Sequence, residues 1–122
     1  MKILIVDDDP ETREVLGMFL NGAGYQSVFY AADAAEAVKQ FVLNEPDVVF
    51  MDVVLPDKSG IDTMREIKSL DKRASFVVMT AYKDADKVIE AFREGALDCI
   101  LKPFNFEYIK NNVLTRVVPR SV

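Results

Sequence analysis

Three short runs of apolar residues, rich in β-branched side chains, stand at residues 3–6, 48–51 and 76–79. Each run is continuous and does not alternate between apolar and polar residues. Runs of this kind are typical of strands buried on both faces, as in a parallel sheet. Weaker strand candidates lie at residues 26–30 and 98–101, so we expect five strands.

Helical patterns separate these strands. N-caps are expected at Asp9 (followed by Pro10), Asp33, Asp84 and Asn105, each ahead of apolar residues at helical spacing. The residues expected to face the core are Val15, Leu16, Phe19, Leu20, Ala37, Val38, Phe41, Val42, Ile61, Met64, Ile67, Val88, Ala91, Phe92, Phe106, Ile109, Val113 and Val117. Strand and helix alternate five times, which predicts an α/β fold with a doubly wound parallel sheet and helices on both faces.

The 122 residues suit a single domain. We expect it to span residues 1–117, with residues 118–122 as a tail or the start of a linker to an effector domain. No apolar stretch is long enough to cross a membrane, and the N-terminus does not read as a signal peptide. We therefore expect a cytoplasmic protein.

Composition excludes several functions. The net charge of −5 argues against direct nucleic-acid binding, which needs clustered Lys and Arg. The chain has one cysteine, Cys99, and no histidine, so an internal disulfide, a typical zinc site and a Ser-His nucleophile pair are all ruled out. Any catalysis must use carboxylates, lysines, hydroxyls or a bound ion.

Polar residues follow the predicted strands. Asp7 and Asp8 follow the first strand, Asp52 the third, Thr80 the fourth and Lys102 the fifth. Ligands of open parallel sheets bind beyond the carboxyl ends of the strands, so we expect these side chains to converge. Clustered carboxylates without His or Cys suit a hard cation such as Mg²⁺.

The same residues suit phosphoryl transfer. Asp52 is the candidate nucleophile, which would form an aspartyl-phosphate, and Lys102 supplies a positive charge. The Thr80 hydroxyl can donate a hydrogen bond to an incoming anion, and backbone N–H groups around Val53 and Ala81 can add others.

Four motifs carry a resemblance to a known family. They are ILIVDDDP at residues 3–10, VFMDVVLP at 49–56 with Gly60, MTA at 79–81 and LKPF at 101–104. In this order and spacing the chain resembles the response-regulator receiver domains of two-component signalling. The resemblance implies the flavodoxin-like strand order 2-1-3-4-5 and a cis peptide bond before Pro103.

The resemblance also implies roles for individual residues. Asp52 would be the phosphoacceptor, Asp8 a direct Mg²⁺ ligand and Asp7 a ligand through water. The backbone carbonyl of Val54 would also bind the metal. Thr80 and Lys102 would contact the phosphoryl group.

The partners follow from the same resemblance. A sensor histidine kinase would donate the phosphoryl group, and an effector domain or a downstream protein would receive the signal. A phosphorylation-dependent homodimer is a further possibility. Two alternatives stay open: a pseudo-receiver that docks without phosphorylation, and a haloacid-dehalogenase-type phosphohydrolase. The latter uses Asp-x-Asp, whereas Val53 and Val54 follow Asp52 here.

Two departures from the family pattern concern signalling and lifetime. Cys99 stands where many receivers carry a Tyr or Phe that moves with the threonine. We hypothesise that Tyr82 or Phe104 carries part of the signal instead, in which case alanine at both positions should weaken phosphorylation-dependent partner binding. Val54 and Tyr82 carry no amide or carboxylate to orient water, which predicts slow dephosphorylation.

Overall fold

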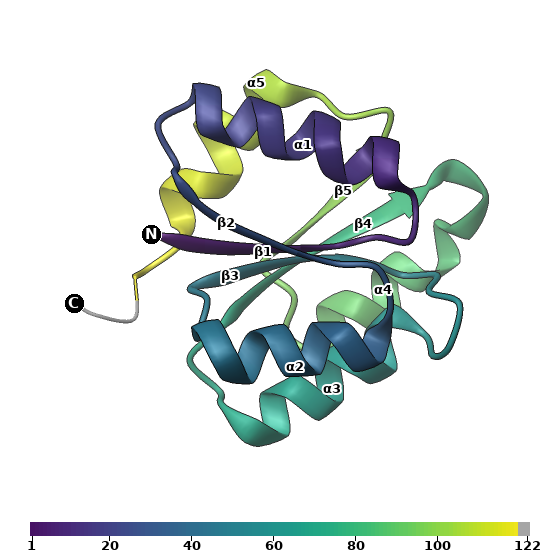
Figure 1. Ribbon diagram of the computed structural model, residues 1–122. Helices are drawn as coiled ribbons and strands as arrows, with labels where there is room; N and C mark the ends of the chain where they lie inside the picture. Colours follow the sequence, from purple (N-terminus) through teal and green to yellow (C-terminus); the bar gives the residue numbers. More distant parts are fainter. Residues whose placement is uncertain (120–122) are drawn as a thin grey trace.

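A computed structural model describes residues 1–119, without the side chain of Tyr82 (Figure 1). Its centre is one sheet of five parallel strands in the order β2-β1-β3-β4-β5. The strands are β1 Lys2–Val6, β2 Ser27–Ala31, β3 Val48–Asp52, β4 Ser75–Ala81 and β5 Asp98–Lys102. The five expected strands and the expected strand order are confirmed.

Helices cover both faces of this sheet (Figure 1). They are α1 Pro10–Gly22, α2 Ala34–Asn44, α3 Gly60–Leu70, α4 Asp86–Arg93 and α5 Phe106–Tyr108. Alternate strand residues feed two apolar cores, as expected for a sheet buried on both faces. One core joins the sheet to α2, α3 and Ala91 of α4, and the other joins it to α1 and the C-terminal segment.

The last helical segment is not a regular α-helix. α5 continues into a π-helical turn, Ile109–Val113, and a 3₁₀ turn, Leu114–Arg116. The buried carboxylate of Asp98 holds this segment against β5. It accepts a hydrogen bond from the Tyr108 hydroxyl at 2.6 Å and forms an ion pair with Arg116.

Three of the four expected N-caps are confirmed. The side chains of Asp9, Asp33 and Asn105 accept backbone N–H bonds at the starts of α1, α2 and α5. The expectation for Asp84 is wrong. A 3₁₀ turn, Tyr82–Asp84, precedes α4, and the cap position falls on Ala85, which makes no side-chain capping bond.

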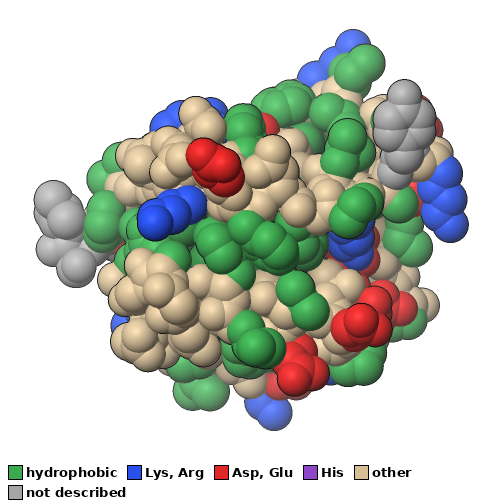
Figure 2. Space-filling model, turned by 90° about the horizontal axis from the view of Figure 1, so that it is seen from above, with side chains coloured by type: hydrophobic (Ala, Val, Ile, Leu, Met, Phe, Trp, Pro, Cys, Tyr) green, Lys and Arg blue, Asp and Glu red, His purple; other side chains and the backbone are tan. Residues whose placement is uncertain are grey.

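Some residues expected in the core are exposed. Val15, Val42 and Phe92 keep 42%, 63% and 48% of their surface accessible. Each is next in sequence to a residue that faces the core, and lies about 100° from it around the helix. The buried face of each helix is therefore narrower than the apolar pattern suggested. A band of hydrophobic side chains also runs across the middle of the face seen from above, on the side of α1 and α5 (Figure 2).

No helix in the described part of the chain is both long and apolar enough to cross a membrane. Within the expected tail, Val118 is exposed and Pro119 half-buried, while residues 120–122 lie outside the described residues.

Candidate functional site

The predicted site residues meet at the carboxyl edge of the sheet. Asp7 and Asp8 follow β1, Asp52 ends β3 and Lys102 ends β5. Because β1 and β3 are neighbours, the carboxylate oxygens of Asp7, Asp8 and Asp52 lie within 4.8 Å of one another. The three acids differ in exposure, since Asp7 and Asp52 are buried and Asp8 is exposed.

Lys102 bridges the two buried acids. Its Nζ lies 2.5 Å from Asp7 Oδ2 and 3.0 Å from Asp52 Oδ2. Burial alone would lower the pKa of Lys102, but the hydrogen bonds and negative charges of Asp7 and Asp52 together outweigh burial and raise that pKa. Lys102 therefore remains a cation beside Asp52. The peptide bond between Lys102 and Pro103 is cis, as the resemblance implied.

The carboxylate of Asp52 is held in one orientation. Lys102 donates to Oδ2, and the backbone N–H of Val54 donates to Oδ1 at 3.1 Å. Burial raises the pKa of Asp52, the nearby Asp7 raises it further, and the bonds from Val54 and Lys102 oppose the rise. The net direction is upward, because burial and Asp7 together outweigh the bonds from Val54 and Lys102.

The loop after β3 is packed against the strand that ends in Asp52. A Cβ on Gly60 would lie 1.8 Å from the Asp52 carbonyl oxygen, so only glycine fits there. Between Asp52 and Gly60, the Asp57 carboxylate accepts the N–H groups of Ala34 and Ala35 at 2.9 and 3.1 Å. These contacts fix the loop that carries Val54.

Asp9 does not take part in the acid group. Its carboxylate accepts the Thr12 hydroxyl and the Glu11 N–H, both at 3.0 Å. These bonds, the one from Thr12 first, lower the pKa of Asp9. It is the N-cap of α1, as expected from its position before Pro10.

Like the buried Asp7, Thr80 does not line the open space beside Asp52. The residue is fully buried, and its hydroxyl donates to the carbonyl oxygen of Ala81 at 3.0 Å. A contact between Thr80 and a phosphoryl group would need this hydroxyl to turn, so that role stays a prediction.

A hollow of about 290 Å³ opens over Asp52. Its wall combines residues that sequence analysis selected with two that it missed, and the lining is Asp8, Asp52, Val54, Ala81, Lys83, Asp84 and Lys102. Lys83 and Asp84 lie in the 3₁₀ turn after β4. Their closeness to Thr80, three and four residues along the chain, could have indicated them. Asp84 was instead predicted to be a helix cap.

The residues proposed as substitutes for the missing aromatic side chain are only partly described. Burial, and then Asp98, raise the pKa of the half-buried Cys99 to about 11, so its thiol stays protonated. Phe104 packs edge-on against Phe106, with ring centroids 6.1 Å apart. The side chain of Tyr82 lies outside the described part of the chain, so its role stays a prediction.

The donor set fits a hard divalent cation. Asp7, Asp8 and Asp52 each offer a carboxylate oxygen to one point. Oxygen ligands with an exposed acid at the rim suit Mg²⁺, which keeps several waters. The raised pKa of Asp52 agrees with a carboxylate that a bound cation would stabilise.

Comparison with known proteins gives the family. A model of the response regulator receiver domain matches residues 3–114. Chemotaxis protein CheY of Thermotoga maritima is 39% identical over 84% of this chain and 86% of its own length. Sporulation initiation phosphotransferase F of Bacillus subtilis is 36% identical over 92% of this chain and 90% of its own. The chain belongs to the response regulator receiver domain family.

Solved structures and longer relatives support the same family. A putative response regulator from Chloroflexus aurantiacus is 37% identical, with a TM-score of 0.83, and the match covers 94% of this chain and 98% of that one. Regulatory protein AtoC of Escherichia coli is 35% identical over 87% of this chain, but the match covers only 23% of AtoC. Receiver domains therefore occur among its relatives both nearly alone and within longer proteins.

Proposed function

We propose that this receiver domain accepts a phosphoryl group from a sensor histidine kinase on Asp52, in a reaction that needs Mg²⁺. The observation that carries the proposal is the state of the Asp52 carboxylate. It is held by Lys102 and the Val54 N–H on the floor of an open hollow, beside two further acids. The buried carboxylate of Asp98 also has an ion pair and hydrogen bonds, but Asp52 in addition lines a hollow that it shares with Asp8 and Lys102.

The reaction forms one bond and breaks one. An oxygen of Asp52 attacks the phosphorus, and the bond from phosphorus to the histidine nitrogen of the kinase breaks. Its electron pair stays on that nitrogen. Lys102 already contacts Asp52 Oδ2, so its ammonium is placed to offset charge on the phosphoryl oxygens. The Thr80 hydroxyl would add a hydrogen bond after turning from the Ala81 carbonyl.

Asp7, Asp8, Asp52 and the backbone carbonyl of Val54 are the proposed metal ligands. When bound, Mg²⁺ would neutralise the acids and the negative charge of the phosphoryl group. The same residues would catalyse both acceptance and later loss of the phosphoryl group, so the domain is enzyme-like without being a conventional turnover enzyme.

The output is a change of surface. A phosphoryl group adds roughly −1.5 to −2 charge at neutral pH. We propose that this change alters binding to an effector domain or downstream protein, or promotes a homodimer, in the cytoplasm. Neither nucleic acid nor membrane is a proposed partner of this domain. We also propose residues 1–117 as the receiver unit, with residues 118–122 as tail or linker.

The test is phosphorylation by acetyl phosphate with Mg²⁺, followed by intact mass. The wild-type protein should gain one phosphoryl group only when the metal is present, and Asp52→Asn should gain none. Asp62→Asn is the matched control, because it removes one exposed carboxylate from α3. If the wild-type protein never gains mass but still binds a partner, the phosphorylation-independent docking module is the better account.

A further inference from the structure

Lys83 is a second cation of the hollow over Asp52. β4 ends at Ala81, and the 3₁₀ turn Tyr82–Asp84 brings Lys83 and Asp84 to the wall of this hollow. Lys83 therefore comes from a different element than Lys102, which ends β5. The two lysines share one open space with Asp8 and Asp52.

The two lysines differ in what they already bind. Lys102 is occupied, since it forms ion pairs with both Asp7 and Asp52. Lys83 is exposed, and no described residue forms a hydrogen bond or ion pair with its ammonium. An ammonium that has no internal partner is free to attract a ligand that enters the hollow.

The charges of the site define which ligand that would be. The site has a net charge of −2 when all its groups are ionised. It holds four acids and two lysines, namely Asp7, Asp8, Asp52, Asp84, Lys83 and Lys102. A bound divalent cation brings this total to zero. Without Lys83 it would stay at one negative charge and repel an anionic phosphoryl donor.

We propose that Lys83 attracts the anionic phosphoryl donor into the hollow and, by the same charge, weakens binding of the divalent metal. The inference rests on the proposed function, because it assigns a residue to the same site. The proposal predicts that one substitution of Lys83 slows reaction with the phosphoryl donor and strengthens binding of the metal. A residue that only supports the local structure would change both in the same direction.

The experiment compares Lys83→Gln with the wild-type protein at low ionic strength. We expect phosphorylation by acetyl phosphate to be roughly threefold slower, and Mg²⁺ binding, measured by calorimetry with the metal alone, to be roughly twofold tighter. Both effects should shrink towards nothing in 1 M salt, where the Debye length is about 3 Å. Lys83→Arg should behave like the wild-type protein.

Lys72→Gln is the matched control. Lys72 lies just before β4, at the opposite edge of the sheet, and its loss changes the net charge equally. Equal effects of Lys72→Gln and Lys83→Gln, an unchanged metal affinity in Lys83→Gln, or effects that persist in high salt would each overturn the proposal. If the wild-type protein accepts no phosphoryl group, the proposed function fails, while the metal titration still tests Lys83.

Discussion

Two clusters of charged residues show how burial changes the meaning of an ion pair. In the Lys102 cluster, one lysine bridges Asp7 and Asp52, which keep 1% and 10% of their side-chain surface exposed. In the Arg65 cluster, between α3 and α4, Arg65 forms ion pairs with Asp62 at 2.5 Å, Glu90 at 3.2 Å and Glu94 at 2.9 Å. The Arg65 cluster has more ion pairs, and all of its members are more exposed.

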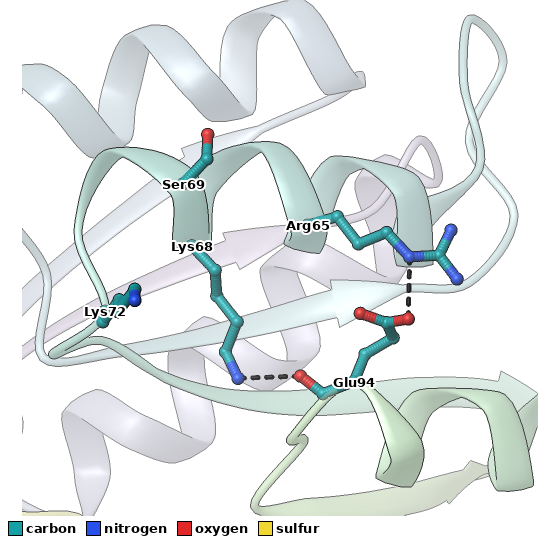
Figure 3. Close-up of a pocket in the computed structure, with 5 residues that line it drawn as sticks. All are labelled: Arg65, Lys68, Ser69, Lys72 and Glu94. Atoms are coloured by element: carbon teal, nitrogen blue, oxygen red, sulfur yellow. Dashed lines mark hydrogen bonds and ion pairs between the residues drawn. The ribbon is translucent and has the colours of Figure 1, made fainter.

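Figure 3 shows Arg65 with one of its three partners, Glu94, at the wall of a hollow of about 410 Å³. Lys68 reaches beside Arg65 and donates to the Glu94 carbonyl oxygen at 2.8 Å, at the end of α4. A cation at a helix C-terminus is favourable, but water and salt screen exposed pairs of this kind. The number of ion pairs in a cluster therefore does not measure its contribution to stability. A buried charge without a partner destabilises the fold, whereas an exposed charge is solvated by water.

The largest effect is expected at Lys102. Lys102→Met keeps the alkyl chain but leaves Asp7 and Asp52 without their shared cation, which should cost about 3 kcal/mol of unfolding free energy. Urea unfolding at neutral pH measures it. The double variant with Asp52→Asn should recover part of the loss, since one buried charge is then gone. A loss below about 1 kcal/mol, as for surface pairs, would erase the contrast between the clusters.

A chemical effect of smaller size is expected at Val54. This side chain is half exposed on the wall of the hollow. An amide there can orient water towards the phosphoryl group, so Val54→Asn should shorten the phosphorylated lifetime roughly tenfold, and Tyr82→Glu should act in the same direction. The decay of the phosphorylated mass measures this, with Val42→Asn on α2 as control. An unchanged lifetime would show that the missing polar group at Val54 does not slow dephosphorylation.

Asp52→Asn should raise stability at neutral pH by a few degrees in Tm. Burial and Asp7 raise the pKa of Asp52 above its ordinary value of 3.8, so the ionised form destabilises the fold. That cost is fully present above the folded-state pKa and disappears as pH falls below the unfolded-state value. The gain should therefore vanish in acid. Thermal unfolding across pH tests it, and a gain that persists at low pH would point to a different cause.

The smallest effect is expected at Arg65. Arg65→Met breaks three exposed ion pairs, yet the urea midpoint should change little, and any change should vanish in high salt. Phosphorylation by acetyl phosphate should be unaffected. A loss as large as that of Lys102→Met would show that the Arg65 cluster is a structural anchor of α4.

Sequence reasoning was most successful where burial is complete. The continuous apolar runs predicted the buried strands β1, β3 and β4, while the partly exposed β2 and β5 left only weaker patterns. The acids and lysine at strand ends predicted which carboxylates meet. It failed at Val15, Val42 and Phe92, because an apolar residue at the margin of a helix face can be exposed at little cost. Lys83 was missed because an irregular turn leaves no periodic pattern to indicate its direction.

We propose that Asp52, and neither Asp7 nor Asp8, forms the covalent bond to phosphorus. Borohydride reduces an acyl phosphate to an alcohol, so treatment of the phosphorylated protein converts the modified aspartate to homoserine. Peptide mass spectrometry then locates it. We expect homoserine in place of Asp52 alone, in the Mg²⁺-containing sample only. Homoserine in place of Asp7 or Asp8 would contradict it.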